Sequence, residues 1–162
     1  MSIRGSVLIC LLVLLICLTV ASNVQAQTTT ITNLQYPEQA VLQNGVAQAS
    51  VTFTVDFSDI PSGSYLNFMI VYAGSAYRPA SATSTPDPCA PFSGLRVTYD
   101  AICRTTPTSS SGTESVSFVL AFNSAQQYRL VAAALMMDTS GHEIGGSVAT
   151  PKAFMISVTY AH

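Results

Sequence analysis

An alternation of apolar and polar residues with a period of two constrains the fold of this chain more than any other feature. In residues 51–57, valine and phenylalanine hold the odd positions, and threonine and aspartate hold the even ones. Residues 116–122 alternate in a similar way. Because successive side chains of a β-strand point to opposite faces, this pattern is typical of strands with one buried face. No segment keeps an apolar period of 3.6 residues long enough to predict a helix, so the expected fold class is all-β.

Turn signals divide the rest of the chain into further strands. Residues 58–63 and the Asp-Thr-Ser-Gly sequence at 138–141 contain the residue types that favour turns. Four more strands are expected over residues 29–34, 65–73, 127–137 and 153–160. The first is expected to be an edge strand that ends before Pro37. Short strands at near-regular spacing predict an antiparallel sandwich or a barrel.

One connection does not fit this spacing. Residues 74–113 are rich in serine, threonine and proline, and they contain two of the four cysteines. Loops of this length without structure of their own are uncommon, and they are often functional or disordered. Residues 95–99 are the one stretch within it that is expected to form a short strand. The segment is therefore interpreted as an insertion between two strands.

A resemblance to a known family rests on the segment from Tyr128 to Ala134, the turn at 138–141 and the Gly-Gly-Ser at 145–147. These residues resemble the F strand and F–G turn of a fibronectin type III domain, in which a tyrosine hydroxyl bonds back to the preceding corner. Tyr128 stands in that place. The resemblance implies an immunoglobulin-like antiparallel sandwich of about seven strands, with residues 51–57 as strand B and 116–122 as strand E.

The chain departs from that family in three respects. It has no tryptophan, no Arg-Gly-Asp in the F–G turn, and a long C–E insertion at 74–113. Integrin-type adhesion is therefore not carried over. Because sandwiches of this kind host many functions, the resemblance implies architecture and does not assign a role.

The N-terminus has the layout of a secretory signal peptide. Arg4 precedes an apolar run over residues 7–18, and a polar stretch with small residues follows. The run is shorter than the roughly 20 residues that cross a bilayer core. Residues 1–26 are predicted to be removed between Ala26 and Gln27, with Ala21 as the alternative cleavage position. Cleavage would leave a mature domain at residues 27–162. This domain is expected to be secreted or to lie at the cell surface, without a membrane span.

Cysteine usage agrees with export. Cys10 and Cys17 lie in the leader, so Cys89 and Cys103 remain in the mature chain. Two cysteines in an exported domain most simply form one disulfide, which here would staple the insertion. A zinc site needs about four ligands, and no histidine lies near this pair.

The charge content excludes two classes of partner. Only 9% of the residues are charged, against an average of about 25%, and the formal net charge is −2. Nucleic acid and anionic lipid both require a basic surface, so neither is expected as a partner. The surface is predicted to be neutral and rich in hydroxyl groups.

No set of residues predicts catalysis or a cofactor. His142 lies near Ser140 in an expected turn, but adjacent turn residues rarely point toward each other, and no Gly-x-Ser-x-Gly sequence is present. The acidic and histidine side chains that could ligate a metal are expected to serve as ordinary turn residues. They are Asp56, Asp59, Asp138, His142 and Glu143. The chain is predicted not to be an enzyme and to hold no metal.

The most informative constellation is apolar and lies where water is expected. If Leu66, Phe68 and Ile70 face the core, the residues between them face outward. The same parity applies to residues 127–137 and to the last strand, which should lie beside them. The expected interaction face consists of Met69, Val71, Val131, Ala133, Leu135, Met137 and Met155. A patch of this kind needs a cover, either the segment 74–113 or another chain, unless the register is shifted by one residue.

These observations predict a non-catalytic binding or structural module. Its protein contacts should run through the apolar C–F–G face and the disulfide-closed loop. One alternative is a carbohydrate-binding module that stacks sugars on Tyr65, Tyr77, Tyr99 or Phe92. The other is a filament subunit that donates residues 27–34 to a neighbour by strand addition.

Overall fold

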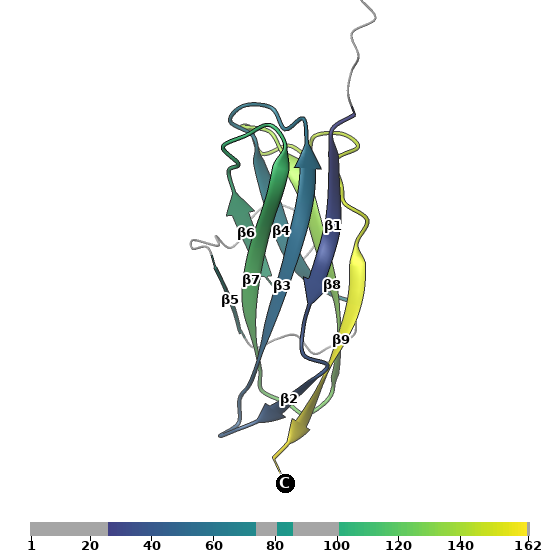
Figure 1. The fold of residues 1–162 in the computed structure, drawn as a ribbon. Coiled ribbons are helices and arrows are strands. Elements are labelled where there is room, and N and C mark those ends of the chain that lie inside the picture. The colour runs from purple at the N-terminus through teal and green to yellow at the C-terminus, as the bar shows by residue number, and fades with distance from the viewer. Residues whose placement is uncertain (1–25, 74–80, 86–100, 162) are drawn as a thin grey trace, which may run out of the picture.

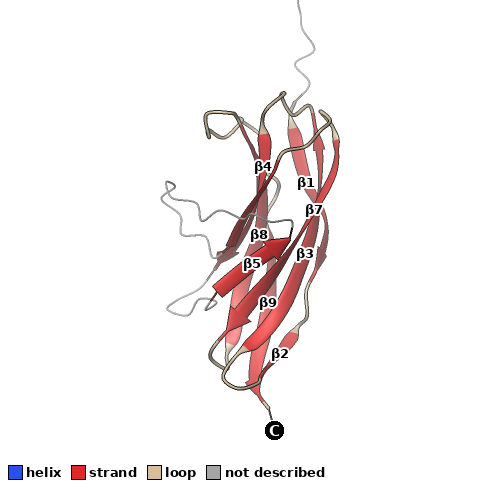
Figure 2. Ribbon diagram, turned by 90° about the vertical axis from the view of Figure 1, so that its left-hand side faces the viewer, coloured by secondary structure: helices blue, strands red, loops and turns tan. Residues whose placement is uncertain are grey.

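Two β-sheets packed face to face make up the computed structural model, which describes residues 26–73, 81–85 and 101–161 (Figures 1 and 2). The strands of these residues are β1 Thr28–Gln35, β2 Gln39–Leu42, β3 Ala47–Ser58, β4 Tyr65–Tyr72, β5 Ser81–Thr85, β6 Ala101–Thr105, β7 Gly112–Phe122, β8 Gln127–Met137 and β9 Lys152–Tyr160. The all-β, two-layer prediction is confirmed. The expected strand at 127–137 coincides with β8, and the other five expected strands fall within one or a few residues of β1, β3, β4, β7 and β9.

The strand order is that of an immunoglobulin-like sandwich. One sheet has the order β1-β3-β7-β5 and the other β2-β9-β8-β4-β6. All neighbours are antiparallel except β2, which runs parallel to β9. With β3, β4, β7, β8 and β9 as strands B, C, E, F and G, the arrangement ABED against CFG is present, and the predicted neighbours C, F and G do pair. The expected number of about seven strands is too low, because the described residues contain nine.

The segment between β4 and β7 was predicted to be one long insertion, but it contains two strands that belong to the sheets. β5 pairs with β7 and β6 pairs with β4, so residues 81–85 and 101–105 extend both sheets. β5 contains only serine, threonine and alanine, which gave no apolar alternation to identify it. The strand expected at 95–99 and the residue Cys89 lie outside the described residues, and the Cys89–Cys103 disulfide stays a prediction.

Aromatic rings fill the centre of the core. Phe53 on β3 packs against Phe68 on β4, with ring centroids 5.4 Å apart, and against Phe118 on β7 at 5.9 Å. All three are fully buried. Residues that alternate along each strand face this core, as the period of two predicts. The phenylalanines thus occupy the space between the sheets in a chain that has no tryptophan.

Tyr128 forms the corner that the family resemblance predicts. Its hydroxyl donates to the backbone oxygen of Ser124 at 3.1 Å, and it lies 2.8 Å from the Ser124 hydroxyl. Its ring packs on Phe122 with centroids 4.4 Å apart. The backbone N–H of Val158 donates to the oxygen of Gln126, so β9 is tied to the same corner. The turn from β7 to β8 is therefore held by bonds on both sides.

β1 is an edge strand of its own sandwich. It pairs with β3 along its length, and Ile31 is buried in the core. The Thr29 hydroxyl also donates to the backbone oxygen of Ser147, which lies in a segment bonded to β8. The donor segment of the filament alternative, residues 27–34, is thus already paired within one chain from Thr28 onward.

A tight hairpin connects β2 of the second sheet to β3 of the first. Asn44 and Gly45 both have positive φ, and Gln43 and Val46 exchange two backbone hydrogen bonds of 2.9 and 3.1 Å. This is the two-residue turn that Asn-Gly favours. The hairpin, the end of β9 and the C-terminus lie together at the lower end of the molecule in Figure 1.

Candidate functional site

The outer side of the β4–β8 pair carries a second apolar cluster, separate from the core. Its buried members are Tyr65, Met69, Ile102, Ala133, Leu135 and Met137, with Val71 partly buried beside them. In the strand register Met69 lies between Ala133 and Ile102, so three strands contribute to one row. The inward residues Leu66, Phe68 and Ile70 belong to the core. We call this cluster the apolar face.

Most of the apolar face is already withdrawn from water in a single copy of the chain. Its buried members are only 2–9% exposed. Val71 and Val131 are half-buried, and Met155 is 43% exposed. These values leave only part of the predicted interaction face accessible in a single copy of the chain.

A strip of apolar residues remains accessible toward β9. Val71 pairs with Val131, which pairs with Ala153, so these three residues form one row across β4, β8 and β9. Met155 lies one step further along β9, opposite Arg129. We call these four residues, Val71, Val131, Ala153 and Met155, the apolar strip.

An unpaired amide lies within the apolar face. Asn67 is 1% exposed, and neither its amide nitrogen nor its amide oxygen has a hydrogen-bond partner within the described part of the chain. It lies between Leu135 on β8 and Arg104 on β6. Because a buried polar group without a partner costs about 1–3 kcal/mol, the position is destabilising.

Arg104 borders the apolar face at its β6 edge. Its guanidinium lies 3.8 Å from the centre of the Tyr65 ring and donates to the Tyr65 hydroxyl at 3.2 Å. A cation over an aromatic face is attracted by the ring quadrupole. Tyr65 is consequently buried beneath this side chain and offers no exposed ring for a sugar, contrary to the carbohydrate alternative. Tyr77, Tyr99 and Phe92 lie outside the described residues.

The outer side of the β1–β3–β7 sheet has the opposite chemistry. Hydroxyl groups meet across neighbouring strands there, and we call this surface the hydroxyl face. The pairs are Thr28–Ser58 at 2.8 Å, Thr52–Ser117 at 2.7 Å and Thr54–Ser115 at 3.2 Å, with Thr113 donating to Asp56 at 2.7 Å. This confirms a hydroxyl-rich surface on one side of the sandwich, on which Asp56 adds one carboxylate.

The turn after β8 contains Ser140 and His142, the two residues considered above as a possible nucleophile and base. The Asp138 carboxylate accepts the backbone N–H groups of Ser140 and His142, each at 2.8 Å. His142 Nδ1 lies 3.6 Å from the second carboxylate oxygen. The backbone N–H of His142, with a smaller contribution from that of Ser140, lowers the pKa of Asp138. Ser140 contributes its backbone to this turn, so the geometry is that of a capped turn rather than a nucleophile–base pair.

Asp56 and Asp59, two further candidates for ion binding, take part in local hydrogen bonds through different groups. Asp56 accepts the Thr113 hydroxyl, and the backbone N–H of Asp59 donates to the Ser111 hydroxyl at 3.1 Å. Across the three described ranges, no three side chains of the metal-ligating types gather at one place. The same ranges contain no helix with the length and apolarity needed to cross a bilayer.

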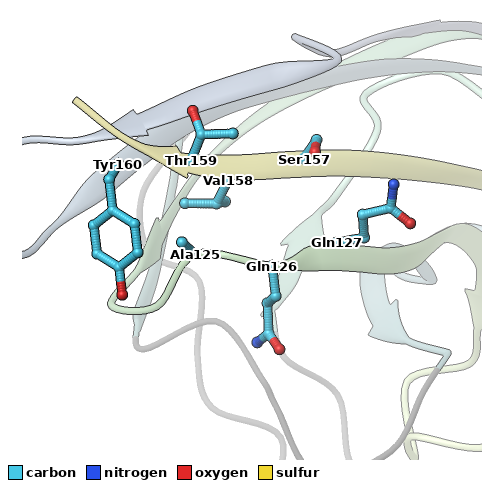
Figure 3. Close-up of a pocket in the computed structure, with 7 residues that line it drawn as sticks. All are labelled: Ala125, Gln126, Gln127, Ser157, Val158, Thr159 and Tyr160. Carbon is cyan, nitrogen blue, oxygen red and sulfur yellow. The ribbon is translucent and has the colours of Figure 1, made fainter. Parts of the chain in front are cut away.

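A shallow pocket opens at the lower end of the sandwich (Figure 3). It has a volume of about 370 Å³ and is lined by Ala125, Gln126, Gln127, Ser157, Val158, Thr159 and Tyr160. Tyr160 is 70% exposed. Figure 3 shows its ring and the Gln126 amide pointing in the same direction, with Ala125 between them. We call it the end pocket.

Comparison with known proteins gives no family. No family model and no curated protein matches the chain. A cohesin module from a Clostridium perfringens family 33 glycoside hydrolase is similar in structure, with a TM-score of 0.42 and 11% identity over 84% of this chain and 98% of that one. The B domain of a biofilm associated protein has a TM-score of 0.39 and 10% identity, over 85% of this chain and 45% of that one. Likeness at this level identifies neither a family nor a function.

The sequence interpretation missed the residues of the end pocket and the buried Asn67. Tyr160 ends the expected last strand, where a strand-end tyrosine gives no sign of its exposure. Asn67 interrupts the apolar run of β4. A polar residue inside a strand that is apolar on both faces is the signal that could have identified it.

Proposed function

We propose that the chain is an exported, non-catalytic binding or structural module that contacts another protein through the apolar strip. The supporting observation is the exposure of Met155 beside the row of Val71, Val131 and Ala153. These residues lie on neighbouring strands of a sheet whose other side is packed against the core. A rigid sheet fixes their positions before binding, which reduces the ordering cost of association.

Site-specific photocross-linking tests this proposal. A benzophenone side chain at Met155 is expected to capture a second protein in the cells that export the chain. The same group at Ser50 on the hydroxyl face is the matched control, because Ser50 is also exposed and in a strand. A strong product from position 155 and a weak one from position 50 supports the contact. Equal products from the two positions, or none from 155, contradicts it.

Sedimentation velocity distinguishes a second copy from a different partner. If the strip joins two copies, the mature chain sediments as a dimer and Met155→Asp sediments as a monomer. If the strip binds another protein, both variants are monomers and the cross-linked product has the mass of a heterocomplex. A monomer without any cross-linked product overturns the proposal.

We also propose that the chain is exported with residues 1–26 removed and that Cys89 and Cys103 form a disulfide. An intact mass measurement tests both points. The intact mass of the protein recovered outside the cell should match a chain that starts at Gln27. It should also be two hydrogen atoms lighter than the reduced chain if Cys89 and Cys103 are bonded. A mass that includes residues 1–26, or no change on reduction, contradicts the respective prediction.

A further inference from the structure

The end pocket combines an exposed aromatic ring with neutral polar groups. None of its lining side chains carries a formal charge. Its volume of about 370 Å³ lies at the small end of the range of roughly 300–1,000 Å³ that is usual for ligand pockets. The size and the chemistry together suit one ring of a neutral, hydroxylated ligand.

The Tyr160 ring is placed by the sheet but not covered by it. Tyr160 is the last residue of β9 and pairs with Leu42 on β2, so its backbone is fixed. The residue is nevertheless 70% exposed. The negative face of an aromatic ring attracts the weakly positive C–H groups of a ring stacked on it. A sugar ring presents such C–H groups on its faces and hydroxyl groups around its rim.

Gln126 is held in place beside this ring. Its side-chain nitrogen donates to the Ser124 hydroxyl at 3.3 Å, and Ser124 is bonded to the buried Tyr128 hydroxyl at 2.8 Å. Its backbone oxygen accepts the N–H of Val158 at 2.8 Å. A side-chain amide that uses one N–H in this way keeps a second N–H and its oxygen for a ligand. The tyrosine corner therefore orients a donor and an acceptor toward the pocket.

We propose that the end pocket binds one residue of a neutral oligosaccharide, stacked on Tyr160 and hydrogen-bonded by Gln126. Gln127, Ser157 and Thr159 supply further neutral polar groups at the rim. An anionic sugar is disfavoured because no arginine or lysine lines the pocket to pair with a carboxylate or sulfate. This site goes beyond the protein contact proposed above, since the residues of the apolar strip do not line it.

Titration followed by ¹H–¹⁵N NMR tests the site and its location together. The probes are the trisaccharides of glucose, xylose, mannose and N-acetylglucosamine in β- or α-linked form, with trigalacturonic acid as the anionic comparison. The expected result is a saturable shift of the backbone signals of residues 125–127 and 157–160 with at least one neutral trisaccharide. Tyr160→Ala is expected to weaken that binding about tenfold, since it removes the stacking surface.

Matched variants separate a stacked ring from general loss of structure. Tyr160→Phe keeps the ring and should retain most of the affinity, whereas Gln126→Ala should lose part of it. Val148→Ala removes another exposed apolar side chain, one outside the pocket, and should change nothing. The proposal is overturned if no neutral trisaccharide shifts these signals at millimolar concentration, if only trigalacturonic acid binds, or if the shifts map to the hydroxyl face.

Discussion

On the outside of the β1–β3–β7 sheet, hydroxyl groups pair across neighbouring strands in contact with water, whereas on the outside of the β4–β8 pair methionine and leucine side chains are buried. Both sheets obey the same alternation on the side that faces the core. The difference lies wholly in the outward residues. On the hydroxyl face Thr52 lies opposite Ser117, whereas on the apolar face Met69 lies opposite Ala133.

This difference shows what the period of two does and does not determine. The period assigns each residue to a face, and the residue type on the outward face then indicates whether water or protein lies against it. A strand that is apolar on both faces is typical of a sheet covered on both sides. β4 and β8 have this character and are buried on both faces over most of their length, while β3 and β7 are not.

The largest expected effect comes from placing a charge on each face in turn. Leu135→Asp would bury a carboxylate among apolar side chains, and the bordering Arg104 is already engaged with Tyr65. We expect this variant to lower the free energy of unfolding by roughly 3 kcal/mol or more. Ser50→Asp places the same group on the exposed side of β3 and should cost no more than about 1 kcal/mol. Urea unfolding with matched slopes measures both changes. Similar losses from the two variants would show that the apolar face is open to water.

A gain of stability is expected at the one polar residue of the apolar face that has no partner among the described residues. Asn67→Leu replaces an unpaired amide by an apolar side chain with the same branching and the same number of heavy atoms, and we expect the free energy of unfolding to rise by about 1–2 kcal/mol. Thr52→Val, at a half-exposed position of the hydroxyl face, should change it by less than about 0.5 kcal/mol. Thermal and urea unfolding of the two variants provides the comparison. A loss of stability in Asn67→Leu would mean that the amide is hydrogen-bonded in solution.

The sequence predicted the strands with strong alternation and missed those without it. The patterns of residues 51–57 and 116–122 led to β3 and β7, and Tyr128 led to the corner that its hydroxyl forms. β5 and β6 were missed, because each has only five residues and their pairing with β7 and β4 spans a long stretch of sequence. β2 was missed although Asn44-Gly45 is a strong hairpin signal.

The candidate sites were less accessible to sequence reasoning. Parity predicted that Met69 and Leu135 share the outer side of one sheet, and the structure places them there. Burial of that side depends on what packs over it, which no local pattern encodes. The end pocket brings residues 125–127 beside residues 157–160, so it exists only after β8 and β9 have paired. Exposure of the Tyr160 ring likewise depends on the tertiary arrangement.

A smaller effect measures how far the cross-strand hydroxyl pairs stabilise the hydroxyl face. The Thr52 and Ser117 hydroxyls lie 2.7 Å apart on paired strands. A double-mutant cycle with Thr52→Val and Ser117→Ala should give a coupling of about 0.2–1 kcal/mol. The pair Thr30 and Asp56, which lie opposite each other without a hydrogen bond between their side chains in the described structure, is the control and should couple less. Equal coupling in the two pairs would contradict a role for the hydroxyl contact.

The smallest expected effect lies outside both faces, in the turn after β8. Hydrogen bonds from the His142 and Ser140 backbone hold the pKa of Asp138 below its usual value of about 3.9. A depressed folded-state pKa stabilises the protein fully above the unfolded-state value, and this stabilisation is lost as pH falls through the folded-state value. Asp138→Asn should therefore be slightly less stable than the wild type at pH 7, and the two thermal midpoints should converge below about pH 4.

Salt distinguishes the cause of that shift. Because the backbone N–H groups of His142 and Ser140 are larger causes than the charge of the His142 imidazole, the difference between wild type and Asp138→Asn should persist at high ionic strength. His142→Ala keeps its backbone N–H and should retain most of the difference. A difference that disappears with added salt, or with the imidazole, would assign the effect to the ion pair and not to the turn.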